Sequence, residues 1–238
     1  LGFHQGFSLY NVGFTAGIVG MVVLGFLNAF GIEVETKALA NTESPFILYG
    51  LLIGLCLILL ATSFYLHVQK KEKYHFKLLL KLSGRLPSDF VEMTNLATVT
   101  FNMSIMGFIL LGYVLINGGQ LNGPIVGSII GAMSFGAFGN QVKNTVPVLV
   151  GIMIGCYLTG VDVASTSALV AAIFGTTLAP VSGYYGPLAG VIAGFVHITL
   201  VSHVVVMHGG LNLYNNGFAG GFVAAVLVPI FEIFEGIR

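Results

Sequence analysis

Charged residues are scarce in this chain, and their scarcity excludes a soluble domain. Only 8 % of the 238 residues are charged, whereas 56 % are hydrophobic. A soluble domain needs a largely polar surface, which this composition does not supply. The nine basic and nine acidic residues cancel, so no net positive field points to a nucleic-acid partner. We therefore expect an all-α protein, a polytopic transmembrane helical bundle in a lipid bilayer.

Cysteines and catalytic signatures are equally sparse. Cys56 and Cys156 lie inside apolar runs, where we expect small core residues. The sequence contains no Ser/His/Asp spacing, phosphate loop, dinucleotide fingerprint or metal motif, so we expect no catalytic residue, no cofactor and no metal. Proton or sodium coupling would need an acid within the bilayer, and the one candidate, Asp162, is better placed in a turn that caps the next helix. These absences favour a channel or facilitator over a coupled pump.

Apolar segments separated by short polar or Gly/Pro breaks predict eight membrane spans. Each segment has about 15 to 23 residues, the length that crosses a hydrocarbon core of about 30 Å. The Gly-rich fourth segment is the one most prone to dip in and return. The residues from Tyr74 to Leu82 predict an interfacial helix, and Ser88 or Asp89 should cap a further short helix. The predicted spans lie near residues 12–30, 46–68, 100–117, 123–138, 146–160, 166–182, 187–207 and 211–231.

The distribution of charge predicts the orientation and the division of the chain. Six of the nine cations fall in one stretch, which the positive-inside rule places in the cytoplasm: Lys70, Lys71, Lys73, Lys77, Lys81 and Arg85. The acidic turn with Glu33, Glu35, Glu43 and the single cation Lys37 would then lie outside. We divide the chain into the end of a truncated first repeat (1–30), an external turn and transmembrane helix (31–69), a basic cytoplasmic loop with interfacial helices (70–99) and a second-repeat transmembrane core (100–238).

One motif occurs twice. Residues from His4 to Gly17 recur as His208 to Gly221 at an offset of 204, with nine identities among the seventeen positions 4–20. We infer a duplication whose first copy is incomplete here, so an N-terminal half of the same polypeptide is an expected partner. If all eight segments cross, the two copies run in opposite directions, as in inverted-repeat transporters with broken or re-entrant helices.

A shorter echo places Gly123-Pro and Gly186-Pro at an offset of 63, each followed by glycines four apart. Such stripes let helices pack closely in lipid. The alternative is a pair of half-helices whose N-termini meet near a substrate.

Polar and aromatic residues of the repeated motif are the candidate site. An unpaired amide in hydrocarbon costs several kcal/mol, so these asparagines need partners or water. Amides both donate and accept hydrogen bonds, which suits a neutral polar solute. The structural alternative is an interfacial tyrosine followed by a capping asparagine and a kink. We assign the lining of a passage to Tyr10, Asn11, Phe14, Asn212, Tyr214, Asn215, Asn216 and Phe218.

Four further residues are candidates for a pore mouth or a proton-sensitive position: His4, His208, Lys143 and Asn144. The histidines are the repeated pair, and a capping role is their alternative. Lys143 is the only cation between Arg85 and Arg238. The break around it also predicts an ordinary loop, with Thr145 as the N-cap of the next helix and Pro147 in its first turn.

The runs 121–127, 135–139, 143–147 and 208–218 resemble an uncharacterised family of bacterial and archaeal polytopic membrane proteins, a domain of unknown function. This resemblance implies a prokaryotic plasma membrane, but it does not indicate what the protein does. The pattern Gly-x-x-x-Tyr-Asn-x-x-Phe-x-x-Gly at 6–17 and 210–221 is similar to turns in each half of the urea transporter family. That similarity implies inverted repeats, a homo-oligomer such as a trimer, and passive conduction. The family's tandem Asn-Pro segment has no counterpart here.

These observations predict a channel or facilitative transporter for a small, neutral, urea-like or amide-like solute. Two alternatives stay open. One is a membrane assembly or sensor subunit whose Gly-rich helices only pack. The other is an intramembrane enzyme that uses His4 or His208.

Overall fold

All of the regular secondary structure in the described part of the chain is helical. The computed structural model describes residues 1–34, 46–212 and 214–235. Glu35, Lys37, Glu43 and Arg238 lie outside these residues. The helices are α1 (Asn11–Ala29), α2 (Ile47–Gln69), α3 (Phe76–Leu79), α4 (Phe90–Met93), α5 (Leu96–Ile116), α6 (Gly123–Ser134), α7 (Val142–Thr159), α8 (Thr166–Gly175), α9 (Ala179–Tyr185), α10 (Pro187–Val204) and α11 (Asn215–Glu235), with 3-10 turns η1 (Phe135–Ala137), η2 (Thr176–Leu178) and η3 (Val205–His208).

Six of the described segments are long and apolar enough to cross a membrane. They are α1, α2, α5, α7, the run from α8 to α9, and α11, and two shorter apolar helices span 123–137 and 187–201. The predicted class, an all-α polytopic bundle, is confirmed. Each of the eight segments expected from the sequence corresponds to one of these eight segments of the structure. The agreement arises because residues that end a helix lie between the apolar runs.

The segment that contains α6 passes from one side of the bundle to the other. Before α6, the backbone N–H of Leu121 donates to the hydroxyl of Tyr49, which lies at the start of α2. After α6, the side chain of Gln141 donates to the carbonyl of Leu82, close to the basic stretch that follows α2. The Gly-rich segment therefore does not return to the side where it begins, and it ends in the 3-10 turn η1.

Only one turn of the predicted interfacial helix forms. The helical residues are Phe76–Leu79 instead of the whole run from Tyr74 to Leu82. The ring of Tyr74 stacks on His67, and the backbone N–H of His75 donates to Thr98. These contacts with α2 and α5 hold the start of the run in a non-helical conformation.

Two helix starts were predicted with different success. Asp89 is the N-cap of α4, since its carboxylate accepts from two backbone N–H groups of the first turn. The predicted cap at Thr145 is wrong, because α7 begins at Val142 and is capped by Gln141. Gln141 and Asn144 form a reciprocal capping box, which starts the helix before Pro147. Asp162 lies in the turn before α8, where its carboxylate accepts from Ala164.

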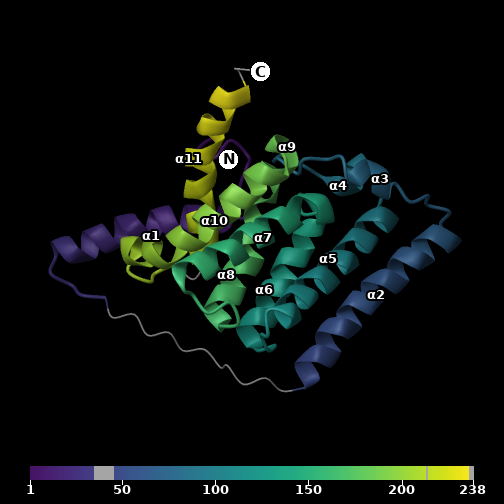
Figure 1. The fold of residues 1–238 in the computed structure, drawn as a ribbon, viewed down its shortest axis with the longest axis horizontal. Helices are drawn as coiled ribbons and strands as arrows, with labels where there is room; N and C mark the ends of the chain where they lie inside the picture. Colours follow the sequence, from purple (N-terminus) through teal and green to yellow (C-terminus); the bar gives the residue numbers. More distant parts are fainter. Residues whose placement is uncertain (35–45, 213, 236–238) are drawn as a thin grey trace.

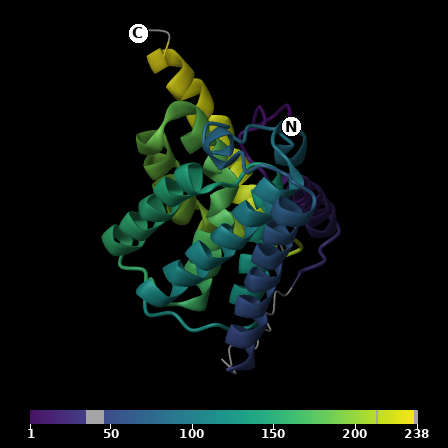
Figure 2. The same ribbon diagram turned by 90° about the vertical axis from the view of Figure 1, so that its right-hand side faces the viewer.

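The helices form a bundle from which α1 projects. α2 and α5 pack together at one edge (Figures 1 and 2), and α7 to α10 form the centre. α1 and α11 meet near their starts and then separate: α1 runs across Figure 1 while α11 runs upward. Cys56 and Cys156 are free, buried core residues, as expected.

Candidate functional site

The first copy of the repeated motif folds as a tight turn around a buried histidine. His4 is fully buried, and its Nδ1 accepts the backbone N–H of Ser8 at 3.3 Å. Nε2 therefore carries the proton and donates to Oδ1 of Asn11, the first residue of α1, at 2.7 Å. Burial lowers the pKa of His4, so the ring is neutral. Gly6 provides the left-handed backbone of the turn (φ 82°).

The second copy repeats this geometry at the same positions. His208 is fully buried, accepts from the backbone N–H of Asn212 at 3.4 Å, and donates to Oδ1 of Asn215 at 3.1 Å. Gly210 takes the same left-handed conformation (φ 73°) as its counterpart in the first copy. The sequence repeat is therefore a structural repeat: a histidine that joins a turn to the first residue of the following helix.

The two motifs pack against each other through their glycines. A Cβ on Gly13 would lie 3.1 Å from Cα of Gly217, so the backbones touch at these equivalent positions. The same Cβ would lie 2.9 Å from Cβ of Tyr214, and a Cβ on Gly217 would lie 3.2 Å from Cβ of Tyr10. Each contact thus has a counterpart in which the two copies exchange roles.

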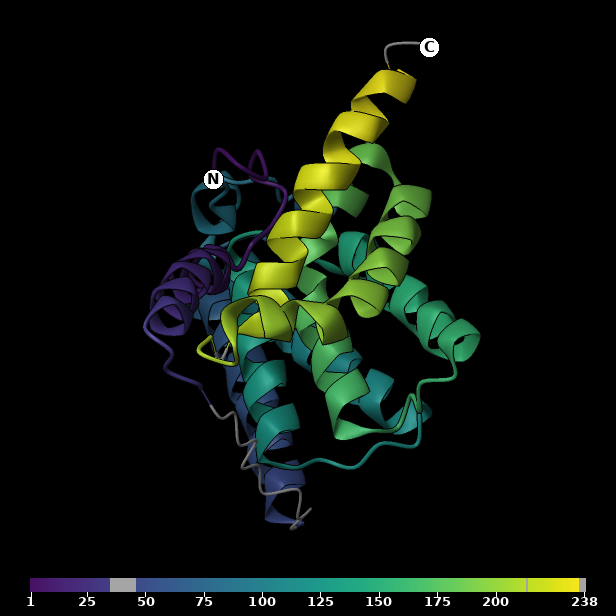
Figure 3. The ribbon, with the colours of Figure 1, turned by 90° about the vertical axis from the view of Figure 1, so that its left-hand side faces the viewer.

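Aromatic rings fill the next turn in the same reciprocal way. A Cβ on Gly17 would lie 2.1 Å from the ring of Phe218, and a Cβ on Gly221 would lie 2.1 Å from the ring of Phe14. Reciprocal contacts are the mark of a two-fold relation. We call this Gly-x-x-x-Gly packing of α1 on α11 the crossing (Figure 3).

The turns that precede the two helices of the crossing lie at different levels of the bundle. The turn before α1 lies on the side of the basic stretch, where the backbone N–H of Leu86 donates to the carbonyl of Gly6. The turn before α11 follows α10, which starts beside the basic stretch at Pro187 and extends for about 27 Å. His208 then contacts Gly20, in the middle of α1. The two copies therefore pack reciprocally, and the inverted topology of the whole repeat stays a prediction.

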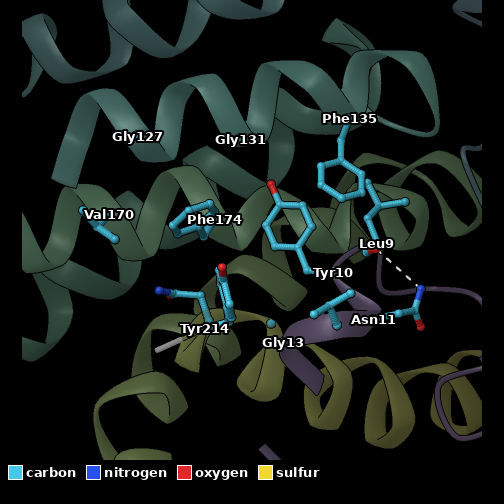
Figure 4. A pocket seen from close by; sticks show the side chains of 13 residues that line it. Leu9, Tyr10, Asn11, Gly13, Gly127, Gly131, Phe135, Val170, Phe174 and Tyr214 are labelled. Atoms are coloured by element: carbon cyan, nitrogen blue, oxygen red, sulfur yellow. Dashed lines mark hydrogen bonds between the residues drawn. The ribbon is translucent and has the colours of Figure 1, made fainter. Parts of the chain in front are cut away.

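A cavity of about 670 Å³ lies beside the crossing. The starts of α1 and α11 form one side, and α6 and α8 form the other (Figure 4). Four of the predicted passage residues line it, two from each copy: Tyr10, Asn11, Tyr214 and Asn216. The remaining lining residues are Leu9, Val12, Gly13, Gly127, Gly131, Phe135, Val170, Phe174 and Gly217.

The other four predicted passage residues do not line this cavity. Phe14 and Phe218 are buried in the crossing, where the facing glycines make room for their rings. Asn212 donates to the carbonyl of Gly13 and accepts from the backbone of Tyr214, so it joins the two copies. Asn215 is held by His208 and by the carbonyl of Val201. These residues position the cavity wall without facing it.

A buried polar cluster lies behind Tyr10. The Tyr10 hydroxyl is 3.3 Å from Oγ1 of Thr176, which also accepts from the amide of Asn140 at 3.3 Å. The amide of Asn102 donates to the carbonyls of Gly136 and Asn140. Burial raises the pKa of Tyr10, which therefore stays protonated. Oδ1 of Asn102 and Oδ1 of Asn140 have no hydrogen-bond partner among the described residues.

Sequence reasoning missed this cluster. Asn102 was readable as a polar residue within an apolar run, and such residues usually face an interior. Asn140 and Thr176 gave no comparable signal, because each lies where a helix ends and a polar residue is ordinary. The breaks at η1 and η2 bring them together.

Lys143 and Asn144 lie away from the cavity. Lys143 is exposed and borders a separate hollow of about 130 Å³, together with Lys81. Asn144 is buried and donates to the carbonyls of Ser83 and Gly139, so it fastens the basic stretch to the start of α7.

Replacing either motif histidine by alanine should destabilise the protein to a similar extent. Each change leaves a buried backbone N–H and an asparagine oxygen without their partner, at a cost of about 1–3 kcal/mol. His4→Ala and His208→Ala can be compared by thermal unfolding in detergent, with the exposed His203→Ala as the control. A lower unfolding midpoint for only one of the two variants would contradict the structural equivalence of the copies.

Comparison with known proteins gives one match. No curated protein and no solved structure is significantly similar to the chain. The model of a family described as "Protein of unknown function (DUF1576)" matches residues 1–29 and 68–233, which include both copies of the motif and the cavity. The chain is a multi-pass membrane protein that belongs to this family of unknown function.

Proposed function

We propose that this protein provides a passage for a small, neutral, polar solute across the membrane, as a channel or facilitator. The observation that carries the proposal is the cavity beside the crossing, to which each copy of the motif contributes a tyrosine and an asparagine. In transporters built from inverted repeats, solutes bind at the interface of the repeats near the middle of the membrane. Following the resemblance described above, we assign the passage to a prokaryotic plasma membrane.

The lining of the cavity favours a neutral solute. None of the residues that line it is charged, so an ion would lose hydration without a compensating partner. Oδ1 of Asn216 accepts from Nε2 of His197 at 3.3 Å, and the amide nitrogen of Asn216 has no partner among the described residues. A donor amide beside tyrosine hydroxyls suits a urea-like or amide-like solute, which carries both donors and an acceptor.

The two alternatives receive less support from the geometry. An enzyme that uses His4 or His208 needs a free ring nitrogen, yet both nitrogens of each ring are engaged in hydrogen bonds within the motif. An assembly or sensor subunit explains the glycine packing of the crossing, but it gives no role to a cavity of about 670 Å³ with polar groups from both copies.

The proposal is tested by solute uptake into proteoliposomes that contain the full gene product. Swelling with urea, formamide, glycerol and ammonium should exceed that of empty vesicles for at least one neutral solute. Asn216→Leu should reduce this permeability, because it removes the free donor, whereas Asn28→Leu at the exposed end of α1 should not. Permeability equal to that of empty vesicles for all four solutes would refute the proposal.

A further inference from the structure

The two helices of the crossing are equivalent in sequence but differ in burial. Val223 of α11 is 1 % exposed, whereas its counterpart Val19 of α1, at the offset of 204, is 56 % exposed. Leu227 and Val23 differ in the same way, at 8 % and 42 %. The face of α1 that corresponds to the buried face of α11 is therefore uncovered.

The difference arises from the rest of the bundle. Within the crossing, α1 and α11 cover each other reciprocally, so their mutual contact cannot bury one more than the other. α11 also packs against α8, α9 and α10, but α1 has its main contacts with α11 and η3 (Figures 1 and 3). The helices of residues 46–210 thus cover α11, and no other group of helices within residues 1–34, 46–212 and 214–235 covers α1 in the same way.

The motif tyrosines show the same asymmetry. The ring of Tyr10 packs against Phe135 at 4.5 Å and Phe174 at 5.6 Å between centroids, and its hydroxyl contacts Thr176. Tyr214, the counterpart of Tyr10, is 60 % exposed. Two independent features, a helix face and a tyrosine, therefore lack the same partner.

We propose that the uncovered face of α1, together with Tyr214, is the docking surface of a second helical module with the architecture of residues 46–210. The two-fold relation of the crossing that places α1 on α11 also places this module on α1. α11 directly follows its own module in the chain, so the second module precedes α1 in the same polypeptide. This inference is independent of transport, since it depends only on the repeat.

A second copy of this chain does not satisfy the geometry. The groove that would receive α1 is formed by the helices of residues 46–210, and in each copy α11 of that copy already fills it. Only a module whose own closing helix is α1 has this groove free. The surface therefore fits a covalently attached repeat better than a homodimer.

Substitutions at symmetry-related positions in the full gene product test this assignment. Val19→Trp should lower the midpoint of thermal unfolding as much as Val223→Trp, and Tyr214→Ala as much as Tyr10→Ala. The control pair is Val22→Trp and Val226→Trp, whose side chains are 62 % and 60 % exposed and should face lipid in both copies. Unfolding is followed in detergent by size-exclusion chromatography after heating.

Each outcome decides the matter. Equal decreases of the unfolding midpoint within each of the first two pairs, and no decrease in the control pair, support the second module. A harmless Val19→Trp beside a damaging Val223→Trp would show that α1 faces lipid and would overturn the inference. A lower unfolding midpoint for Val19→Trp without a matching decrease for Tyr214→Ala would point to a partner that is not related by the two-fold axis. Equal decreases in a gene product that has no module before α1 would point to a separate chain. Either result would overturn it as well.

Discussion

A leucine in place of Gly17 is expected to separate α1 from α11 and to unfold the crossing. A Cβ at this position would lie 2.1 Å from the ring of Phe218, which is itself fully buried between the two helices. Overpacking of a core costs about 1–3 kcal/mol when neighbours can adjust. Here the ring is fully buried, so we expect a larger loss, measured as a fall in the midpoint of thermal unfolding.

The repeat supplies the controls for this experiment. Gly221→Leu should be equally damaging, because it meets the ring of Phe14 at the same distance. Gly25→Leu, on the same helix, should be harmless, since no atom lies within 4 Å of a Cβ at that position. Adding Phe218→Ala to Gly17→Leu should restore part of the lost stability. A stable Gly17→Leu protein would contradict the packing described for the crossing.

Tryptophan in place of Gly127 is expected to close the passage while leaving the fold intact. Gly127 lies on α6 at the wall of the cavity, and a Cβ there meets no atom within 4 Å. The indole ring would therefore extend into the cavity without displacing a helix. We expect the solute permeability of proteoliposomes to fall by about tenfold or more, which corresponds to a barrier raised by ~1.4 kcal/mol.

A tryptophan at a glycine away from the cavity serves as the control that distinguishes a blocked passage from a damaged fold. Gly112 on α5 also has no atom within 4 Å of a Cβ and does not line the cavity, so Gly112→Trp should leave permeability unchanged. Both variants should elute and unfold like the parent protein. Normal permeability of a correctly folded Gly127→Trp protein would show that solute does not pass through this cavity.

Much of the fold could be predicted from the sequence because lipid makes local composition decisive. In hydrocarbon the backbone must satisfy its own hydrogen bonds, so each apolar run has to be helical. Positions that depend on tertiary contacts were less predictable. Gln141, not Thr145, caps α7, and its side chain also donates to the carbonyl of Leu82 in the distant basic stretch.

The candidate site could be predicted only in part. The recurrence of Tyr10 and Tyr214 identified the motif, and both line the cavity. It did not distinguish residues that face the cavity from those that build the crossing, because Phe14 and Phe218 repeat equally well. A residue that recurs in both copies can serve packing as well as binding, so recurrence alone does not show which of the two it serves.

The sequence by itself determined the solvent, the helices and the existence of two equivalent motifs, since composition, hydropathy and repetition are properties of the chain alone. The tertiary structure decided which motif residues meet. The glycines at 13, 17, 217 and 221 let two backbones approach until equivalent residues touch. The helix breaks at η1 and η2 place Asn140 and Thr176 behind Tyr10. Contacts between segments some 200 residues apart arise from three-dimensional packing, which no local pattern in the chain specifies.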